Sequence, residues 1–238
     1  MIKFFRKIRQ NLLMENKTGK YFKYAIGEIV LVVIGILIAL QINNWNENLK
    51  SQAKELKIIK ELKTDLISNK NRLKYKLEFF KKTKKDGKLL EKHLTNKLAY
   101  NDSLQSYFSI PLQNFSFLLT YSAYENLKSQ GFDNISNDKL RLSIIRLYDE
   151  KFGLIKDQEF KMSNIFTNTS VPMSLEYFRT TLTGGQVPND YEKLLNTSEF
   201  TNLVSQMAFA SGEYENISEN TIIEIDQLLK DIETEIKK

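Results

Sequence analysis

Few side chains in this 238-residue chain have the types and spacing that catalysis requires. The single histidine, His93, has no second histidine and no cysteine with which to bind a metal ion. No serine lies in a G-x-S-x-G frame, so the usual nucleophile arrangements are hard to assemble. Asp149 and Glu150 are neighbours on an expected helix and point apart, which does not suit paired acid–base chemistry. We therefore expect a non-enzymatic protein with no catalytic, cofactor-binding or metal-binding residues.

Two other features bear on chemistry. Gly184 and Gly185 lack the following Lys-Ser/Thr and the strand context of a phosphate loop, which favours a simple turn. Glu28 is the one ionisable residue in a long apolar run, where such residues often form a proton or ion path. It lies about one turn inside the run, near Lys20 and Lys23, so its side chain can extend to the lipid headgroups. Helix–helix hydrogen bonding and a transporter-accessory role are the alternatives for Glu28.

The element that positions Glu28 is the run Ala25–Ile42, AIGEIVLVVIGILIALQI. At about 1.5 Å per residue it spans roughly 27 Å, close to the thickness of the hydrocarbon core. Three alternatives are weaker: the run lacks a good signal-peptide cleavage site, the stripe of a soluble core helix and the polar face of an interfacial helix. Residues 24–43 are therefore predicted to form an uncleaved transmembrane helix.

Small residues on this helix could permit close packing against another helix. Gly35 and Ala39 form a small-xxx-small pair, and Gly27 lies two turns earlier on nearly the same face. With Glu28, these residues are the candidates for membrane helix packing.

Charge indicates how the helix is oriented. Residues 1–23 hold seven Lys and Arg against one acid, Glu15, a net charge of +6 that equals the formal charge of the whole chain. The sequence pI of 9.2 is then largely a topology signal, so nucleic-acid binding is not expected. The positive-inside rule places this basic amphipathic segment in the cytoplasm, lying on membrane lipid or against a soluble partner. Tyr21 and Tyr24 at one end and Trp45 at the other are the expected interfacial anchors.

The extramembrane region, residues 44–238, is predicted to be helical. Residues 44–95 repeat apolar positions at steps of three and four, which predicts a stalk that continues the membrane helix. Central helices are expected over 100–170, a distal loop over 171–190, which holds a Gly-Gly pair and two prolines, and a C-terminal helix over 198–237.

The stalk and the C-terminal helix carry opposite charge. Residues 49–92 hold fifteen Lys and Arg against six acids, and Glu213–Ile236 hold eight acids against one Lys. This predicts antiparallel neighbours whose apolar seams are buried together, with ion pairs that set register more than stability. Nucleic acid, lipid headgroups or an acidic partner are the external alternatives for the basic face.

The central residues predict a helix over Phe115–Gln130 closed by Gly131, then an N-cap at Ser136 or Asn137 and a helix to about Ile165. A stripe of aromatic residues precedes and enters this region: Tyr107, Phe108, Phe115, Phe117, Tyr121 and Tyr124. Such a stripe is more often core than the lining of a ligand pocket.

The opening KFFRKIRQNLLMENKTGKYFKYAIGEIVLVVIGILIALQINNWNE and, more loosely, YSAYENLKSQGFDNISNDKLRLSIIRLY resemble an uncharacterised family of single-pass inner-membrane proteins from Bacteroidota. The likeness is specific over roughly residues 2–60, and its leader is YAIGEIVLVVIGILIALQINNWNE. The resemblance implies an inner-membrane protein that faces the periplasm, and it supplies no activity.

The sequence therefore predicts an all-α protein with one transmembrane helix, a stalk and an elongated antiparallel bundle, with its N-terminus in the cytoplasm. Our hypothesis is a non-enzymatic envelope scaffold or assembly partner that binds a protein partner or a second copy. The alternative is a ligand-sensing periplasmic ectodomain that signals through a separate cytoplasmic protein. A pocket among the aromatics favours sensing, and an exposed apolar seam on the stalk favours assembly.

Overall fold

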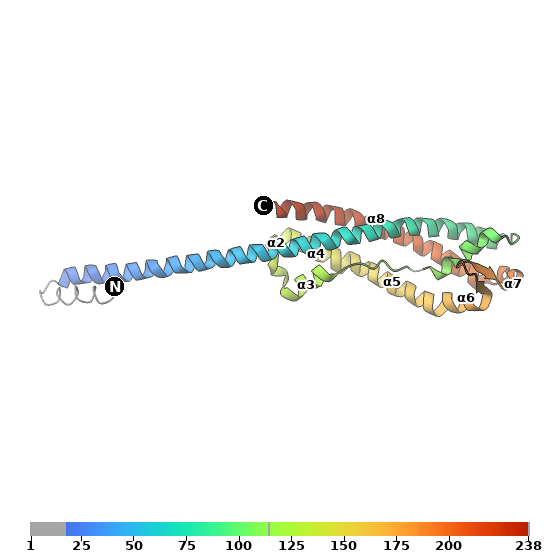
Figure 1. Cartoon of the computed structure of the whole chain (residues 1–238), viewed down its shortest axis with the longest axis horizontal. Helices are drawn as coiled ribbons and strands as arrows, with labels where there is room; N and C mark the ends of the chain where they lie inside the picture. Colours follow the sequence, from blue (N-terminus) through green and yellow to red (C-terminus); the bar gives the residue numbers. More distant parts are fainter. Residues whose placement is uncertain (1–17, 114, 238) are drawn as a thin grey trace. The chain divides into compact units, whose positions relative to one another are not determined.

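The computed structural model describes residues 18–113 and 115–237, so most of the predicted basic segment 1–23 lies outside it. The described residues are mainly helical, which confirms the all-α class. The elements, most of which are labelled in Figure 1, are α2 (Thr18–Thr95), η1 (Asp102–Leu112), α3 (Ser122–Gln130), η2 (Phe132–Asn134), α4 (Asp138–Arg146), η3 (Leu147–Phe152), α5 (Gly153–Ile165), η4 (Phe166–Ser170), α6 (Val171–Tyr177), β1 (Phe178–Thr180), β2 (Gln186–Pro188), α7 (Tyr191–Leu195) and α8 (Ser198–Ile236).

The chain divides after Glu55 into two units, which are described separately. The first contains the beginning of α2. The second begins at Leu56 and contains the rest of α2 and all the other elements.

The second unit is built from three long helical runs. The end of α2 and the whole of α8 are two of them, and Figure 1 shows them side by side. The third runs from Asp138 to Tyr177 without interruption, because η3 and η4 are π-helical turns within it and the backbone stays in the right-handed helical region at each junction. Asn137 caps the start of this run by accepting hydrogen bonds from the backbone N–H groups of Lys139 and Leu140, which confirms one of the two predicted N-caps.

The interior of the second unit contains two clusters of buried apolar residues. The larger lies between α2, α8 and the run from Asp138, and it includes Leu62, Leu66, Ile225 and Ile232, each 0% exposed. The smaller joins the end of α2 to η1, β1, α7 and the start of α8. Both long seams predicted from the apolar spacing therefore contribute to the core.

The prediction of a helix over all of Phe115–Gln130 is wrong in its first half, since α3 begins only at Ser122. The segment 115–121 is not helical, and in it the buried Phe115 and Phe117 alternate with the half-buried Ser116 and the exposed Leu118. Leu118 has a φ of +54°, an unusual value for a side chain of this size.

Side chains from neighbouring helices form hydrogen bonds with three backbone groups of this segment. The side-chain amide of Asn69 donates to Thr120 O at 2.8 Å, and its Oδ1 accepts from Thr120 N at 2.7 Å. The carboxylate of Glu159 accepts from the N–H of Phe117. The segment is extended because these partners satisfy the N–H of Phe117 and both backbone groups of Thr120, and because both phenylalanines are buried.

The predicted distal loop over 171–190 is also wrong in part. The helical run continues through α6 to Tyr177, and Pro172 follows directly after the π-helical turn η4, where the regular hydrogen-bond pattern of the α-helix is already interrupted. The strands β1 and β2 then pair antiparallel, with Phe178 opposite Pro188. Gly184, with a φ of +82°, lies between the strands, which confirms the predicted turn.

Candidate functional site

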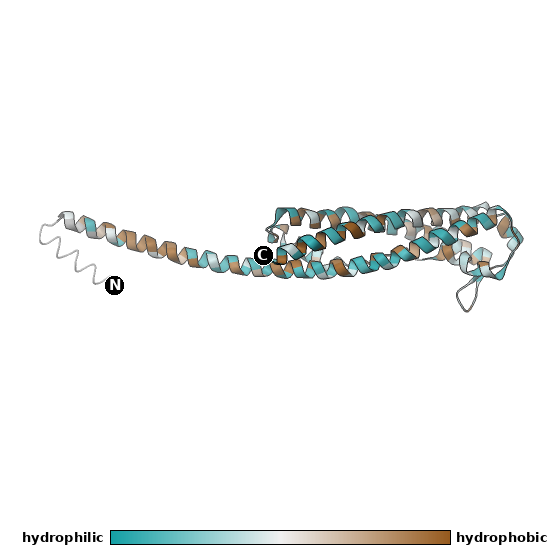
Figure 2. Ribbon diagram, turned by 90° about the horizontal axis from the view of Figure 1, so that it is seen from above, coloured by the Kyte–Doolittle hydropathy of each residue, from teal (hydrophilic) through white to brown (hydrophobic). Residues whose placement is uncertain are grey.

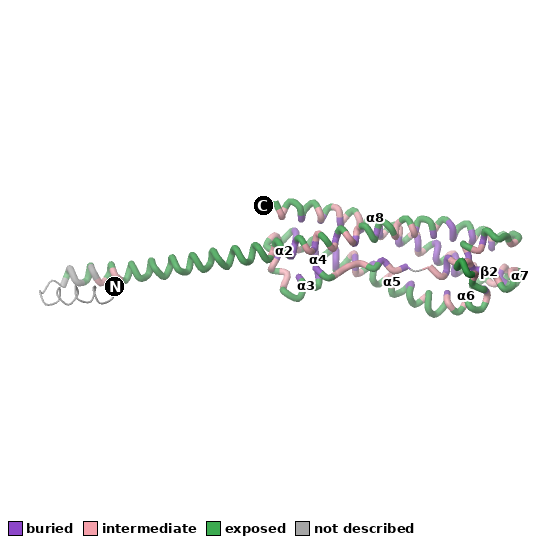
Figure 3. Tube along the Cα trace, viewed as in Figure 1, coloured by how far each residue is buried: buried purple, intermediate pink, exposed green. Residues whose placement is uncertain are grey.

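The apolar run predicted to cross a membrane lies within α2. Its best 18-residue window has a mean hydropathy of 2.6, and none of that window is buried. Figure 2 shows this stretch as mainly apolar, and Figure 3 shows nearly all of it exposed, with Ala25 and Glu28 half-buried. It is the one helix among the described residues that is long and apolar enough to span a membrane. It therefore lacks the burial within the described residues that is typical of the core helix of a soluble protein.

The predicted packing residues all lie on this exposed stretch. A Cβ atom added at Gly27 or Gly35 would meet no described atom within 4 Å. Ala39 is exposed and Glu28 is half-buried. No described element therefore packs against the two glycines, and their surface is open to a neighbouring helix.

The predicted interfacial anchors can be assessed in part. Tyr21 and Tyr24 belong to α2, and their side chains lie outside the description. Trp45 is 63% exposed. Leu49 is 46% exposed and Ala53 is also exposed, so this part of the predicted seam has no partner within residues 18–113 and 115–237.

The predicted pairing of the basic stalk with the acidic C-terminal helix is confirmed. Lysines of α2 form ion pairs with acids of α8: Lys63 with Glu233 at 2.8 Å, Lys70 with Asp226, Lys81 with Glu219 at 3.0 Å, and Lys84 with Glu215 at 3.0 Å. The lysine numbers rise as the acid numbers fall, which is the order of antiparallel helices. Acids of α8 therefore pair with four of the fifteen basic residues in 49–92.

The aromatic stripe is mainly core, as predicted. Phe108, Phe115, Phe117 and Tyr124 are each at most 5% exposed, and Tyr107 and Tyr121 pack against the buried clusters. Phe80 of α2 lies within 5.5 Å of the rings of Phe115, Phe117 and Tyr214, measured between ring centroids.

A cavity of about 650 Å³ lies beside this aromatic core, between the run α5–η4 and the segment that contains Phe115 and Ser116. Lys156, Glu159 and Phe160 on α5 also line it. Phe160 follows the apolar spacing of this helix in the sequence, yet it is 69% exposed. Lys156 and Glu159 have the spacing of ordinary surface positions, so no sequence signal distinguished them.

The residues considered for chemistry have structural partners. His93 Nε2 lies 3.1 Å from the carbonyl oxygen of Ala99, just beyond the end of α2. Asp149 and Glu150 are both exposed, and Glu150 pairs with Arg146 at 3.4 Å. Within the described parts of the chain, no three His, Asp or Glu residues are grouped as a metal site would require.

Comparison with protein families gives one finding. A model described as a family of unknown function, DUF6090, matches residues 28–212, which include most of the apolar run and most of the second unit. No curated protein and no solved structure matches the chain.

Proposed function

This chain belongs to DUF6090, a family of unknown function, and from that premise we propose that it is a single-pass inner-membrane protein acting as a non-enzymatic envelope scaffold or assembly partner. The observation that carries the proposal is the helix surface of residues 25–55, which is apolar on all sides up to Ile42 and largely exposed beyond it. Lipid covers the first part. A protein surface covers part of the second.

The basic residues before the apolar run support an orientation with the N-terminus in the cytoplasm. The second unit then lies in the periplasm. A reporter that is active only in the periplasm, fused after Lys238, tests this orientation. Activity of a cytoplasm-specific reporter at the same position would overturn it.

A second copy of the chain is the partner that the exposed surface favours. Trp45, Leu49 and Ala53 follow one another at steps of four residues and so lie along one side of α2. Gly35 and Ala39 provide small residues earlier on the same helix, where close approach of two membrane helices depends on packing. Two parallel copies would bury these residues against their equivalents.

The absence of cysteine from the chain allows a direct test by single-cysteine crosslinking. In the full chain in native membranes, Leu49→Cys and Ala53→Cys are expected to form disulfide-linked dimers on mild oxidation. Ser51→Cys, about half a turn away on the opposite side, is the matched control and is expected to give much less dimer. Equal crosslinking at all three positions, or adducts with a different protein alone, would reject the second copy.

A ligand-sensing ectodomain is the second candidate function. The observation that favours it is the cavity of about 650 Å³ in the second unit, which is within the usual size range of small-molecule sites. In that case the helix pair would pass a signal to a separate cytoplasmic protein. Ligand-dependent change in the dimer yield of Leu49→Cys would separate sensing from a constitutive scaffold.

A further inference from the structure

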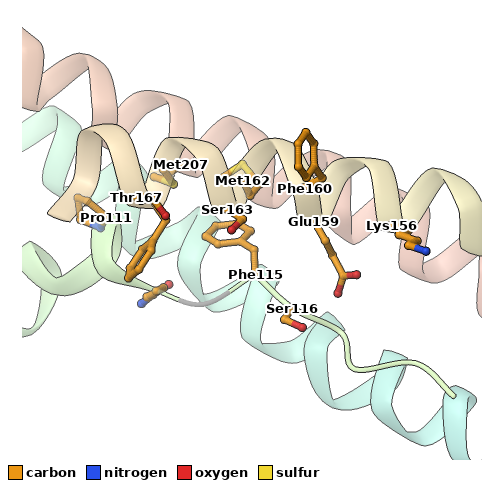
Figure 4. A pocket seen from close by; sticks show the side chains of 12 residues that line it. Pro111, Phe115, Ser116, Lys156, Glu159, Phe160, Met162, Ser163, Thr167 and Met207 are labelled. Atoms are coloured by element: carbon orange, nitrogen blue, oxygen red, sulfur yellow. The ribbon is translucent and has the colours of Figure 1, made fainter.

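The floor of the cavity is apolar and is contributed by three separate elements. Phe115 from the extended segment, Met162 from α5 and Met207 from α8 line it, and they are 5%, 6% and 1% exposed. Figure 4 shows Phe115 beneath α5, close to Met162 and Ser163. Methionine side chains adapt to irregular apolar shapes, so this floor suits a flexible chain better than one rigid ring system.

The wall of the cavity contains an irregular helical turn. Phe166 and Thr167 line the cavity and begin η4, the π-helical turn that runs to Ser170. Phe166 remains 37% exposed although its side chain is large and apolar. Widened turns of this kind are frequent at functional sites. The turn is thus a second observation, separate from the apolar floor, that points to a binding site.

The two charged groups at the rim are not equivalent. The carboxylate of Glu159 accepts a hydrogen bond from Phe117 N–H and interacts with Lys76. Burial lowers the pKa of Lys76, and the charge of Glu159 offsets part of that lowering. Lys156 lies three residues before Glu159, is exposed, and forms no ion pair with any residue in the described ranges. The negative charge at the rim is therefore compensated, and the positive charge of Lys156 is not.

We propose that this cavity binds a long-chain carboxylate, with its alkyl chain on the floor of Phe115, Met162 and Met207 and its head group paired with Lys156. The apolar floor recognises the chain, and charge complementarity selects the head group. Ser163 and Thr167 are exposed and also line the cavity, and their hydroxyl groups offer further hydrogen-bond donors to the carboxylate. This site lies within the second unit and does not depend on the dimer proposed for residues 25–55.

The first test uses the full chain in lipid nanodiscs and a long-chain carboxylate with a diazirine near the end of its chain. Illumination is expected to label peptides that contain Met162 and Met207, identified by mass spectrometry. Ser163→Trp fills the cavity from an exposed position and is expected to reduce that labelling at least tenfold. Ser143→Trp, at an exposed position on α4, is the matched control and should retain it.

The second test concerns the head group. Lys156→Gln is expected to weaken labelling about tenfold, whereas Lys161→Gln, an exposed lysine on the same helix that does not line the cavity, should leave it unchanged. The methyl ester of the probe lacks the negative charge. Its labelling of the native chain should therefore be as weak as the labelling of Lys156→Gln by the acid. Labelling confined to residues 25–42, or labelling unaffected by Ser163→Trp, would overturn the site. Equal labelling by acid and ester would overturn the choice of a carboxylate.

Discussion

Within the second unit, α2 is held on two sides by different kinds of contact. Towards α8 the contacts are periodic: apolar residues three and four apart are buried, and lysines pair with acids along the flank. Towards residues 115–123 the contacts are single hydrogen bonds with no regular spacing. Asn69 bonds the backbone of Thr120, and Asp65 accepts from Ala123 N at 2.9 Å and from Ser122 Oγ at 3.1 Å.

The difference shows two ways of fixing a segment on a helix. A periodic seam spreads its free energy over many residues, so each contributes modestly. An extended segment has few contacts. If a buried side chain that bonds its backbone is removed, the backbone N–H or C=O is left without a partner, at the full cost of its desolvation. We therefore expect larger penalties for single polar changes on the second side than on the first.

Alkaline pH is expected to have the largest effect, because it acts on both sides together. Burial raises the pKa of Tyr121 to about 12 and raises the pKa values of Tyr124, Tyr148 and Tyr214 further. A raised folded-state pKa gives stability that is complete below the unfolded value near 10 and is lost as pH rises through the folded value. Cooperative unfolding as the pH rises from about 10 through about 12, seen by circular dichroism together with tyrosinate absorbance, is the expected outcome.

Tyr148→Phe is the control for this transition. The hydroxyl of Tyr148 is buried and has no hydrogen-bond partner among the described residues, so the substitution should change stability little at neutral pH. It removes one ionisation and should move the alkaline midpoint upward. Loss of structure below pH 10, before tyrosine ionises, would show that other groups control the transition.

Phe80→Ala is expected to cost about 4 kcal/mol, the middle of the range for a buried aromatic residue. Phe80 is 0% exposed and its ring contacts Phe115 and Phe117 of the segment 115–121 and Tyr214 of α8, so the change affects both kinds of contact. Denaturant unfolding followed by circular dichroism measures the loss. Tyr75→Ala, at a residue that is 75% exposed, should change the free energy of unfolding by less than about 0.5 kcal/mol.

Asn69→Ala tests the individual contacts alone. It leaves the N–H and the carbonyl of Thr120 without their partner, at an expected cost of about 3 kcal/mol. Hydrogen exchange should accelerate in residues 117–123 and stay slow in the middle of α8. Asn71→Ala, at an exposed position two residues along α2, is the control. Uniform acceleration across both sides would mean that Asn69 supports the whole bundle instead.

The same difference explains what could be predicted from the sequence. The seams of α2 and α8 were predictable because a period of 3.5 residues and a block of opposite charge are visible along the chain. The cap at Asn137 was predictable because a side chain bonds its own neighbouring backbone. These signals are local or periodic.

The segment 115–121 and the rim of the cavity were not predictable in this way. Asn69 and Thr120 are 51 residues apart, and Phe117 and Glu159 are 42 apart, and no spacing rule connects such partners. Phe115, Phe117, Leu118 and Tyr121 also fit helical spacing, so the tertiary contacts decided between helix and extended chain. Pro172 favoured a loop in the sequence, and its position directly after the π-helical turn η4 made a helix compatible with it.

The ion pairs on the α8 side should show the smallest effect. Lys84 and Glu215 are 38% and 20% exposed, and an exposed or half-exposed pair is worth a fraction of a kcal/mol. Lys84→Glu places two carboxylates together and is expected to cost about 1 kcal/mol, less at high salt because the repulsion is screened. The double variant Lys84→Glu with Glu215→Lys should recover most of the loss, and Lys85→Glu, at an exposed neighbour with no ion pair among the described residues, should be nearly neutral.

If the double variant recovers the free energy of unfolding, the double-mutant cycle gives the coupling between the two residues. A small coupling would show that charge at this position sets the pairing of α2 with α8 and adds little to the stability of the bundle. A loss as large as that of Asn69→Ala, without recovery, would contradict the distinction between periodic and individual contacts. The four lysine–acid pairs would then stabilise the bundle, and the regular side of α2 would be as sensitive to single polar changes as the extended segment.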